Sequence, residues 1–164
     1  MRILFAASEA LPYAKTGGLA DVIEALPKAL VKLGHEVAVF LPRYRGVKST
    51  KVILPSMTIP QGLRLRFPAI TDGSILHGVR YFFLDDPFYF DRGGIYGDKL
   101  HEYPDNAERY AEFCRAGIEL AKQVWLPDVI HCHDWPTALV PVFVKDRRLP
   151  FQTVLTVHDL EYQG

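Results

Sequence analysis

Residues 2–34 read RILFAASEALPYAKTGGLADVIEALPKALVKLG, and this stretch decides the fold. Residues 2–7 form an apolar run that is typical of a strand buried on both faces of a parallel sheet. A loop over residues 8–18 follows it, and apolar side chains then recur at helical spacing over residues 19–33. The stretch therefore predicts a buried strand, a glycine-containing loop and an amphipathic helix.

The end of this helix and the element after it complete a recognisable unit. Gly34 stands where a glycine commonly ends a helix, and Pro27 predicts a bend inside the helix. A second apolar run covers residues 36–41 and stops at Pro42. The order strand, loop, helix, strand is a βαβ unit with a right-handed crossover and a parallel strand pair. Its spacing is typical of a nucleotide-binding half-domain.

The rest of the chain predicts a mixed set of elements. We expect strands at 52–54, 63–70 and 75–84, with a hairpin turn at Thr71-Asp72-Gly73-Ser74 between the last two, and a structured loop over 85–103. A helix is expected from Asp105, where Glu108 completes a capping box, with apolar spacing up to Trp125. A buried strand at 128–132, a helix at 136–145 and a buried strand at 153–157 follow.

These elements predict an α/β fold for residues 1–164: a Rossmann-like, mainly parallel sheet with flanking helices and an antiparallel excursion in the middle. Ligands of such sheets bind outside the carboxyl ends of the strands. Three polar clusters follow predicted strands at those ends: residues 8–18, residues 133–135 and residues 158–159. We therefore expect them to converge on one site.

Composition excludes several classes of function. The chain has 164 residues with 19 basic and 19 acidic side chains, so its formal net charge is zero. This balance argues against a nucleic-acid partner and gives no attraction to an anionic membrane. No apolar run approaches the roughly 18–20 residues that span a bilayer, and the run after Met1 is too short for a signal peptide. We therefore expect a cytoplasmic protein. Its two cysteines do not make a disulfide framework.

The loop Lys15-Thr16-Gly17-Gly18 has the features of a phosphate-binding turn. The two glycines allow a ligand to approach the backbone, and the first amides of the following helix lack partners and carry partial positive charge. Lys15 adds a full charge. An ordinary strand-to-helix turn with a solvated lysine fits the same spacing. The GxGxxG and GxxxxGK[ST] patterns are both absent, which argues against a nicotinamide, flavin or P-loop site.

A second candidate cluster is His131-Cys132-His133-Asp134-Trp135. Strand alternation puts Cys132 on the opposite face from the two histidines, which argues against a metal site. We expect His131 in or beside the sheet, with His133 and Asp134 at the strand end. Asp134 and Trp135 suit a sugar, because a carboxylate accepts hydroxyl hydrogen bonds and an indole covers an apolar ring face. Asp134 as a cap for the next helix is an alternative.

His158 ends the last predicted strand. A histidine there can donate to a ligand oxygen or to a developing charge, or it can be a satisfied structural residue. The spacing assigns no Ser/His/Asp or Cys/His nucleophile set.

Several segments together resemble the bacterial glycogen synthase and plant starch synthase family. They are Ala7-Ser8-Glu9 with Pro12, Lys15-Thr16-Gly17-Gly18-Leu19-Ala20-Asp21-Val22, Leu41-Pro42-Arg43-Tyr44, Asp91-Arg92-Gly93-Gly94-Ile95-Tyr96, His131-Cys132-His133-Asp134-Trp135 and Thr156-Val157-His158-Asp159-Leu160-Glu161-Tyr162-Gln163-Gly164. They occur in the family's order from residue 1 to residue 164, and KTGGLADV is highly specific to it.

The resemblance implies a retaining, metal-independent glycosyltransferase. The family transfers glucose from ADP-glucose, or UDP-glucose in some members, to the non-reducing end of an α-1,4-glucan. Its GT-B fold has two Rossmann-like domains facing a deep cleft. The first domain mainly binds the acceptor and closes over the donor, and the second binds most of the nucleotide. The resemblance identifies residues 1–164 as the first domain, with the C-terminal nucleotide-binding domain absent.

The resemblance also implies roles for residues that match the family's motifs. The implied sets are Lys15, Gly17 and Gly18 for donor binding, Asp21, Tyr96 and Trp135 for the sugar and acceptor, and His158 and Asp134 for catalysis. Two positions depart from the family's pattern. Asp159 replaces an asparagine, and Pro136 replaces a polar residue.

Three hypotheses follow for an N-terminal domain without its partner domain. The first is an enzyme fragment that is inactive alone, the second a stand-alone glucan- or nucleotide-binding module, and the third half of a split enzyme. A truncated half exposes the face that normally meets its partner, so we also expect some self-association.

Overall fold

The computed structural model describes residues 1–49, 51–98 and 100–162. Its strands are β1 (Arg2–Ala6), β2 (Glu36–Pro42), β3 (Lys51–Leu54), β4 (Ile59–Gln61), β5 (Arg64–Arg66), β6 (Ala69–Leu76), β7 (Val79–Asp85), β8 (Val129–His133) and β9 (Gln152–Thr156). Its helices are α1 (Leu19–Lys32), α2 (Pro87–Phe90), α3 (Asn106–Gln123), the 3-10 turn η1 (Trp135–Thr137) and α4 (Leu139–Asp146). The motif residues Gln163 and Gly164 lie outside the described residues.

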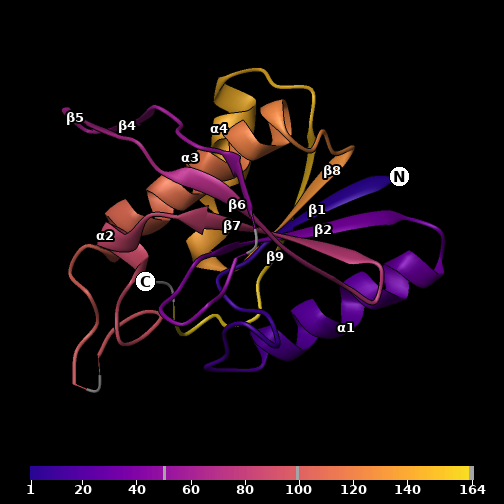
Figure 1. Ribbon diagram of the computed structural model, residues 1–164, viewed down its shortest axis with the longest axis horizontal. Coiled ribbons are helices and arrows are strands. Elements are labelled where there is room, and N and C mark those ends of the chain that lie inside the picture. The colour runs from indigo at the N-terminus through magenta and orange to yellow at the C-terminus, as the bar shows by residue number, and fades with distance from the viewer. Residues whose placement is uncertain (50, 99, 163–164) are drawn as a thin grey trace.

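A seven-stranded sheet of order β3-β6-β7-β2-β1-β8-β9 runs through the molecule (Figure 1). The pairs β1–β2, β1–β8, β2–β7 and β8–β9 are parallel, while β6–β7 and β3–β6 are antiparallel. The predicted Rossmann-like sheet with an antiparallel excursion is therefore confirmed. The parallel strands β1, β8 and β9 share the carboxyl edge on which the site is built.

Helices cover both faces of the sheet, with α1 on one side and α3 and α4 on the other (Figure 1). Alternation along the strands divides the core accordingly. Phe5 of β1 packs in the cluster that contains Ile23 of α1, whereas its neighbour Leu4 packs in the cluster that contains Phe113 of α3. Burial on both faces explains why β1 and β2 appear in the sequence as continuous apolar runs.

The predicted end of α1 is confirmed at Gly34, whose φ of 87° is a left-handed conformation. The Gly34 amide donates to Val31 and the His35 amide donates to Leu30, which is the hydrogen-bond pattern of a Schellman motif. Pro27 lies inside the helix, which continues to Lys32.

The predicted hairpin turn at residues 71–74 is wrong, because these residues lie within β6. The chain turns instead at His77 and Gly78, with φ of 52° and 82°, as a two-residue hairpin turn of type I′ requires. Residues 72–75 form an irregularity in the β6–β7 register. A Cβ atom at Gly73 would lie 2.6 Å from the Phe83 ring, so the glycine serves close packing rather than a turn.

Two other strand predictions need correction. Residues 63–70 do not form one strand, because β5 pairs with β4 in a separate hairpin and ends before Pro68, which cannot donate to a ladder. The strand expected at 153–157 forms as β9 but is not buried. Val154 and Leu155 are 47% and 43% exposed, because β9 is an edge strand in the described part of the sheet.

The capping box predicted at Asp105 is also wrong. Asp105 occupies the N-cap position of α3 but makes no side-chain cap. Its carboxylate instead accepts two hydrogen bonds from Arg92, at 2.7 and 2.6 Å. The helix expected at 136–145 is divided into η1 and α4.

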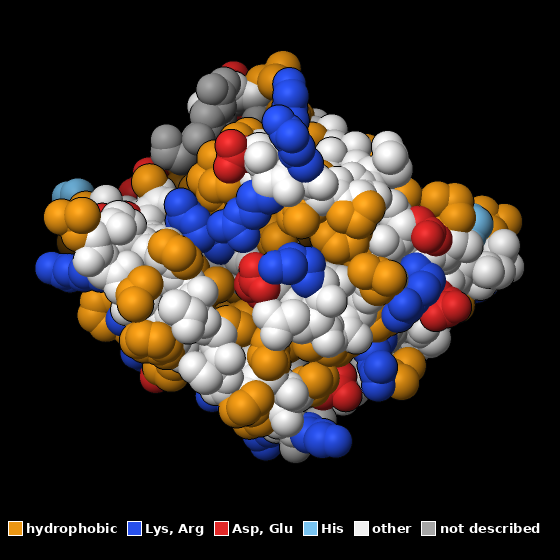
Figure 2. Space-filling view, turned by 90° about the horizontal axis from the view of Figure 1, so that it is seen from above, with side chains coloured by type: hydrophobic (Ala, Val, Ile, Leu, Met, Phe, Trp, Pro, Cys, Tyr) orange, Lys and Arg blue, Asp and Glu red, His pale blue; other side chains and the backbone are white. Residues whose placement is uncertain are grey.

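Two further properties follow the composition. Cys114 and Cys132 are free and buried, as expected of small core residues. Over the described ranges no helix is long and apolar enough to cross a bilayer. Figure 2 shows basic and acidic side chains scattered among apolar ones on one face, without a single-sign patch.

Candidate active site

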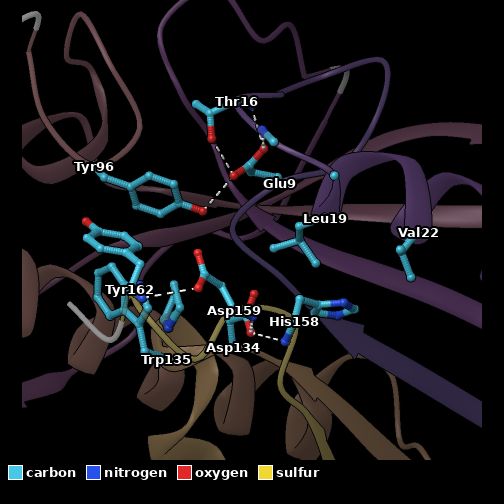
Figure 3. A pocket seen from close by; sticks show the side chains of 13 residues that line it. Glu9, Thr16, Leu19, Val22, Tyr96, Asp134, Trp135, His158, Asp159 and Tyr162 are labelled. Carbon is cyan, nitrogen blue, oxygen red and sulfur yellow. Dashed lines mark hydrogen bonds between the residues drawn. The ribbon is translucent and has the colours of Figure 1, made fainter.

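A cleft of about 550 Å³ opens at the carboxyl ends of β1, β8 and β9 (Figure 3). It is lined by Glu9, Thr16, Gly17, Gly18, Leu19, Val22, Tyr96, Asp134, Trp135, Pro136, His158, Asp159 and Tyr162. The three polar clusters that follow the predicted strands all contribute to this lining. The expectation that they converge is therefore confirmed, and a fourth segment, around Tyr96, joins them.

Glu9 organises the loop between β1 and α1. Its carboxylate accepts hydrogen bonds from the Thr16 amide (2.5 Å), the Thr16 hydroxyl (2.6 Å), the Gly17 amide (3.0 Å) and the Tyr96 hydroxyl (2.8 Å). The residue is 3% exposed. Burial by itself raises the pKa of Glu9, but the hydrogen bonds from Thr16, Gly17 and Tyr96 outweigh it and lower the pKa below its usual value. A buried carboxylate thus fixes the loop.

This arrangement changes which amides are open to a phosphate. The Gly17 amide already donates to Glu9. Within the described residues, the Gly18, Leu19 and Ala20 amides at the start of α1 donate to no acceptor. Helix N-terminal amides of this kind suit an anion. The loop therefore offers the Gly18 amide and those after it. Gly17 lines the cleft without a side chain, which leaves room for a ligand beside the backbone.

Lys15 and Asp21 lie at the rim rather than in the lining. The Lys15 ammonium contacts the Asp21 carboxylate at 2.6 Å, and the two side chains are 44% and 56% exposed. Two predicted site residues are therefore paired with each other. An exposed ion pair of this kind is weak and opens at small cost when a ligand competes for the lysine.

Asp134 has an unusual backbone. It has φ of 58° and ψ of −174°, a conformation that costs a residue with a Cβ atom about 1–3 kcal/mol. The Asp134 amide donates to Thr156, and its carboxylate accepts from the His158 amide at 2.5 Å and the Asp159 amide at 3.4 Å. The carboxylate does not cap the following turn, contrary to the alternative considered for it. Asp134 instead ties the end of β8 to the segment after β9.

His158 lies on the cleft wall next to two other histidines. The rings of His131 and His133 are 4.2 Å apart, and His133 Nδ1 lies 2.8 Å from His158 Nε2. His131 forms a hydrogen bond with the Thr156 hydroxyl at 2.7 Å. Burial, together with the two neighbouring imidazoles, lowers the pKa of His133 to about 3, so its ring is neutral. The expected positions of His131 in the sheet and His133 at its end are confirmed.

Aromatic side chains form another wall of the cleft. The Trp135 ring packs 5.8 Å from Tyr96 and 5.8 Å from Tyr162, with Tyr110 behind it at 4.9 Å. The Tyr96 hydroxyl bonds Glu9 and also Ser8 at 2.7 Å, which links this wall to the α1 loop. Such a surface suits the apolar face of a sugar ring beside polar groups that bind hydroxyls.

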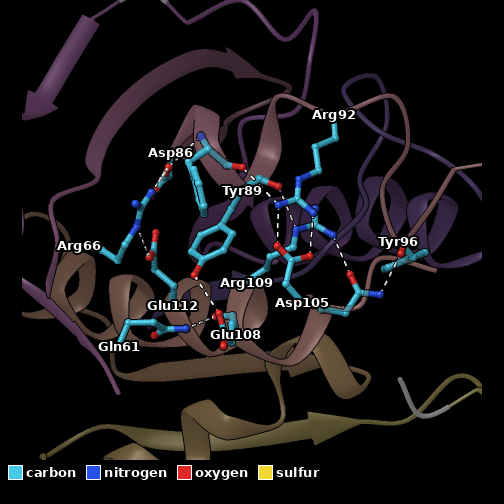
Figure 4. A network of polar contacts seen from close by, with 12 residues as sticks. Gln61, Arg66, Asp86, Tyr89, Arg92, Tyr96, Asp105, Glu108, Arg109 and Glu112 are labelled. Carbon is cyan, nitrogen blue, oxygen red and sulfur yellow. Dashed lines mark hydrogen bonds and ion pairs between the residues drawn. The ribbon is translucent and has the colours of Figure 1, made fainter. Parts of the chain in front are cut away.

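A buried arginine on α3 holds the Tyr96 segment in place (Figure 4). Arg109 is fully buried and donates to the carbonyls of Tyr89 and Ile95 and to the Asn106 side chain. Asn106 in turn donates to the Tyr96 carbonyl at 2.8 Å. The position of Tyr96 therefore depends on α3.

The sequence predictions omitted several residues of this site. Glu9, Thr16 and Tyr162 line the cleft without having been assigned a role. An acidic residue in the loop that begins at the carboxyl end of a buried strand was the available signal for Glu9, because such a loop lies at the ligand edge. Asp159 accepts from the Glu161 and Tyr162 amides, a role that an asparagine oxygen can also fill.

In the part of the chain that the structure describes, no group of three His, Cys, Asp or Glu side chains is arranged to hold an ion. Cys132 is buried, on the face of the sheet opposite the histidines, where it packs in the core cluster that contains Leu4.

Comparisons with known proteins agree with this architecture. A family model described as the starch synthase catalytic domain matches residues 2–164. A glycogen synthase of Koribacter versatilis is 46% identical over the whole chain, and one of Streptococcus pneumoniae is 43% identical. The chain spans 36% and 35% of their lengths, so it corresponds to about a third of these relatives.

Solved structures give the same picture. The catalytic domain of starch synthase IV from Arabidopsis thaliana, bound to ADP and acarbose, superposes with a TM-score of 0.76 at 31% identity. That match covers 98% of this chain and 34% of the other. A sucrose-phosphate synthase from Thermosynechococcus elongatus, 17% identical with a TM-score of 0.59, shares the fold. The chain belongs to the starch synthase catalytic domain family of glycosyltransferases.

Proposed function

We propose that this chain is the acceptor-side domain of a GT-B glucan synthase that transfers glucose from ADP-glucose to the non-reducing end of an α-1,4-glucan with retention of configuration. The domain acts with a C-terminal nucleotide-binding domain and is inactive without it. The reaction takes place in the cytoplasm and needs neither a metal nor a further cofactor, so it should persist in EDTA.

One observation carries this proposal. A single cleft brings together unpartnered amides at the start of α1, a carboxylate and an imidazole at the ends of β8 and β9, and an aromatic wall. Amides at a helix start suit a diphosphate, and the aromatic wall suits a sugar chain. The Arabidopsis relative, whose structure holds ADP and acarbose, is 31% identical to this chain.

Within this proposal each predicted site residue has a role. Lys15 leaves its ion pair with Asp21 and contacts the donor diphosphate. Gly18 donates its amide to the same diphosphate, and Gly17 allows the diphosphate to approach the backbone closely. Asp134 and His158 hold the transferred glucose near the reacting carbon. Asp21, Tyr96 and Trp135 contact the sugar and the acceptor.

The test is a mixing assay. The chain is combined with the C-terminal two thirds of the Koribacter relative, and transfer of labelled glucose from ADP-glucose or UDP-glucose to glycogen is measured. We expect no transfer by the chain alone and transfer by the mixture, preferentially from ADP-glucose. Robust transfer by the isolated chain would contradict the proposal. Glycogen binding that Trp135→Ala abolishes, without transfer by any mixture, would instead indicate a stand-alone binding module.

Lys28 of α1 is a matched control for Lys15 of the preceding loop. In an active mixture Lys15→Ala should lower turnover or donor affinity at least tenfold, because a charge on the diphosphate is lost. Lys28 is also ion-paired, with Glu24, but it lies outside the cleft lining. Lys28→Ala should therefore leave transfer unchanged. Equal kinetics for the two variants would refute the role of Lys15.

A further inference from the structure

His133 and His158 meet edge to edge. Their ring planes differ by 15°, and their centroids are 5.1 Å apart. This separation is close to the 2.8 Å between His133 Nδ1 and His158 Nε2 plus one ring radius on each side. Because the lone pairs and N–H bonds of imidazole lie in the ring plane, nearly coplanar rings in this position form a linear N–H···N hydrogen bond.

The surroundings of His133 decide which ring donates. His133 is fully buried, and its Nε2 has no hydrogen-bond partner among the residues that the structure describes. A proton on Nε2 would leave a buried donor without an acceptor, which costs about 1–3 kcal/mol and is rarer in proteins than an underused acceptor. Protonation of both nitrogens is disfavoured by burial and by the His131 ring 4.2 Å away. The single proton of His133 therefore belongs on Nδ1.

We infer that His133 fixes the tautomer of His158: the buried ring donates from Nδ1 to His158 Nε2, so His158 carries its own proton on Nδ1 and offers the cleft an N–H donor. His133 is thus a positioning residue that acts through His158. The backbone supports the same geometry, because the Asp134 carboxylate accepts from the His158 amide.

The consequence for chemistry rests on the proposed function, whereas the tautomer does not. A neutral His158 with its only proton on Nδ1 donates to a sugar hydroxyl or to a developing negative charge and cannot accept a proton at the nitrogen bonded to His133. We therefore assign His158 the role of a hydrogen-bond donor rather than that of a general base. Strand register makes this possible, since β8 and β9 pair in parallel with His133 opposite Thr156, two residues before His158.

The test is nitrogen NMR of the chain labelled with 15N-histidine. Two-bond correlations to the ring carbon protons distinguish Nδ1 from Nε2, and the protonated nitrogen resonates upfield of the unprotonated one. Spectra are recorded near pH 8, above the ordinary histidine pKa of about 6.5, so that the rings are neutral. The signals missing from His158→Gln identify His158 among the six histidines of the chain. We expect Nδ1–H in His158; a protonated Nε2 would overturn the inference.

Variants of His133 and His131 distinguish the loss of the His133–His158 hydrogen bond from a general change in the packing around His158. His133→Phe keeps an aromatic ring at this position but removes the Nδ1–H donor. His158 should then shift from Nδ1–H to predominantly Nε2–H. In His133→Asn the side-chain amide can replace the Nδ1 donor, and His158 should keep Nδ1–H. His131→Phe alters the neighbouring ring without removing the hydrogen bond and should also keep Nδ1–H. An unchanged tautomer in His133→Phe, or a change in His131→Phe equal to that in His133→Phe, would refute the inference.

Discussion

Glu9 shows how one buried carboxylate determines the shape of a ligand loop. Four donors converge on it, from the Thr16 amide and hydroxyl, the Gly17 amide and the Tyr96 hydroxyl. Hydrogen bonds to a charged acceptor are about twice as strong as neutral ones. The loop that the sequence presents as a phosphate turn is thus held from inside by an anion of the protein itself, and the ligand is left the amides that follow.

Replacing this carboxylate should therefore destabilise the chain in a pH-dependent way. Glu9→Gln should lower the free energy of unfolding by about 1–3 kcal/mol at pH 7. The folded pKa of Glu9 lies below its unfolded value, so the stabilisation is present above about pH 4.3 and is lost as the pH falls through the folded pKa. Urea unfolding of both proteins between pH 6 and pH 3 should show the two stabilities converging in acid.

The control for this experiment is Glu24→Gln. Glu24 pairs with Lys28 on α1, and its side chain is 40% exposed. The loss of such a pair should cost no more than about 0.5 kcal/mol. A cost for Glu9→Gln no larger than that of the control, or parallel pH curves for Glu9→Gln and the unsubstituted chain, would contradict the role assigned to Glu9.

The backbone of Asp134 supports a second prediction at this scale. Asp134→Ala and Asp134→Gly both remove the carboxylate that accepts from His158, but only alanine keeps a Cβ atom at φ of 58°. The glycine variant should be the more stable of the two by about 1 kcal/mol, because glycine adopts this conformation without strain. Thermal denaturation followed by circular dichroism measures the difference. An alanine variant as stable as the glycine variant would show that the backbone is not strained.

At the scale of elements, the hairpin β4–β5 is held to α3 by Gln61, which donates to the Glu108 carbonyl, and by Arg66 (Figure 4). Arg66 contacts Asp86 at 2.6 Å, while its Nε lies 3.4 Å from the carboxylate of Glu112. Glu112 is fully buried. Burial, and then the adjacent Asp86 carboxyl, raise the pKa of Glu112 to about 8, because two buried negative charges share a single guanidinium.

This arrangement predicts a loss of stability toward alkaline pH. A carboxyl group whose folded pKa is raised stabilises the protein below its unfolded pKa, near 4.3, and this contribution is lost as the pH rises through about 8. Relative to Glu112→Gln, whose amide stays neutral, the free energy of unfolding of the unsubstituted chain should therefore fall between pH 5 and pH 8; the opposite contribution of the lowered His133 pKa is common to both proteins and cancels in this comparison. Urea unfolding at pH 5, 6.5 and 8 measures both slopes. The same decrease in Glu112→Gln would refute the assignment.

Local pattern predicted some elements and not others. The βαβ unit was predictable because burial on both faces, helical spacing and the Gly34 stop all act within a short stretch. The hairpin at residues 71–74 was mispredicted because Asp-Gly favours a turn locally, whereas Gly73 is required by the Phe83 ring on the neighbouring strand. Asp105 was mispredicted because Arg92 competes for its carboxylate. In both cases a contact from outside the local segment overrode the local preference.

At the scale of the whole molecule, the convergence of the site was predictable and its internal bonding was not. Carboxyl ends of parallel strands meet at one edge, so the clusters after β1, β8 and β9 had to come together. The bonds that fix the site join Tyr96 to Glu9 and His158 to His133, across 87 and 25 residues of sequence. No periodicity specifies such pairs, because they depend on the three-dimensional register of separate elements.

The position of β9 at one edge of the described sheet supports a last prediction, that this chain associates with itself. An edge strand offers amides and carbonyls to a second strand, and Val154 and Leu155 add apolar surface on opposite faces. Sedimentation equilibrium should show a dimer fraction that rises with concentration. Val154→Lys should abolish the dimer, because a lysine on an edge strand opposes pairing.

Val52→Lys is the matched control, since Val52 is 53% exposed on β3 at the opposite edge of the described sheet. This substitution should leave the dimer intact. A monomer at all concentrations, or dissociation only by Val52→Lys, would contradict association through β9.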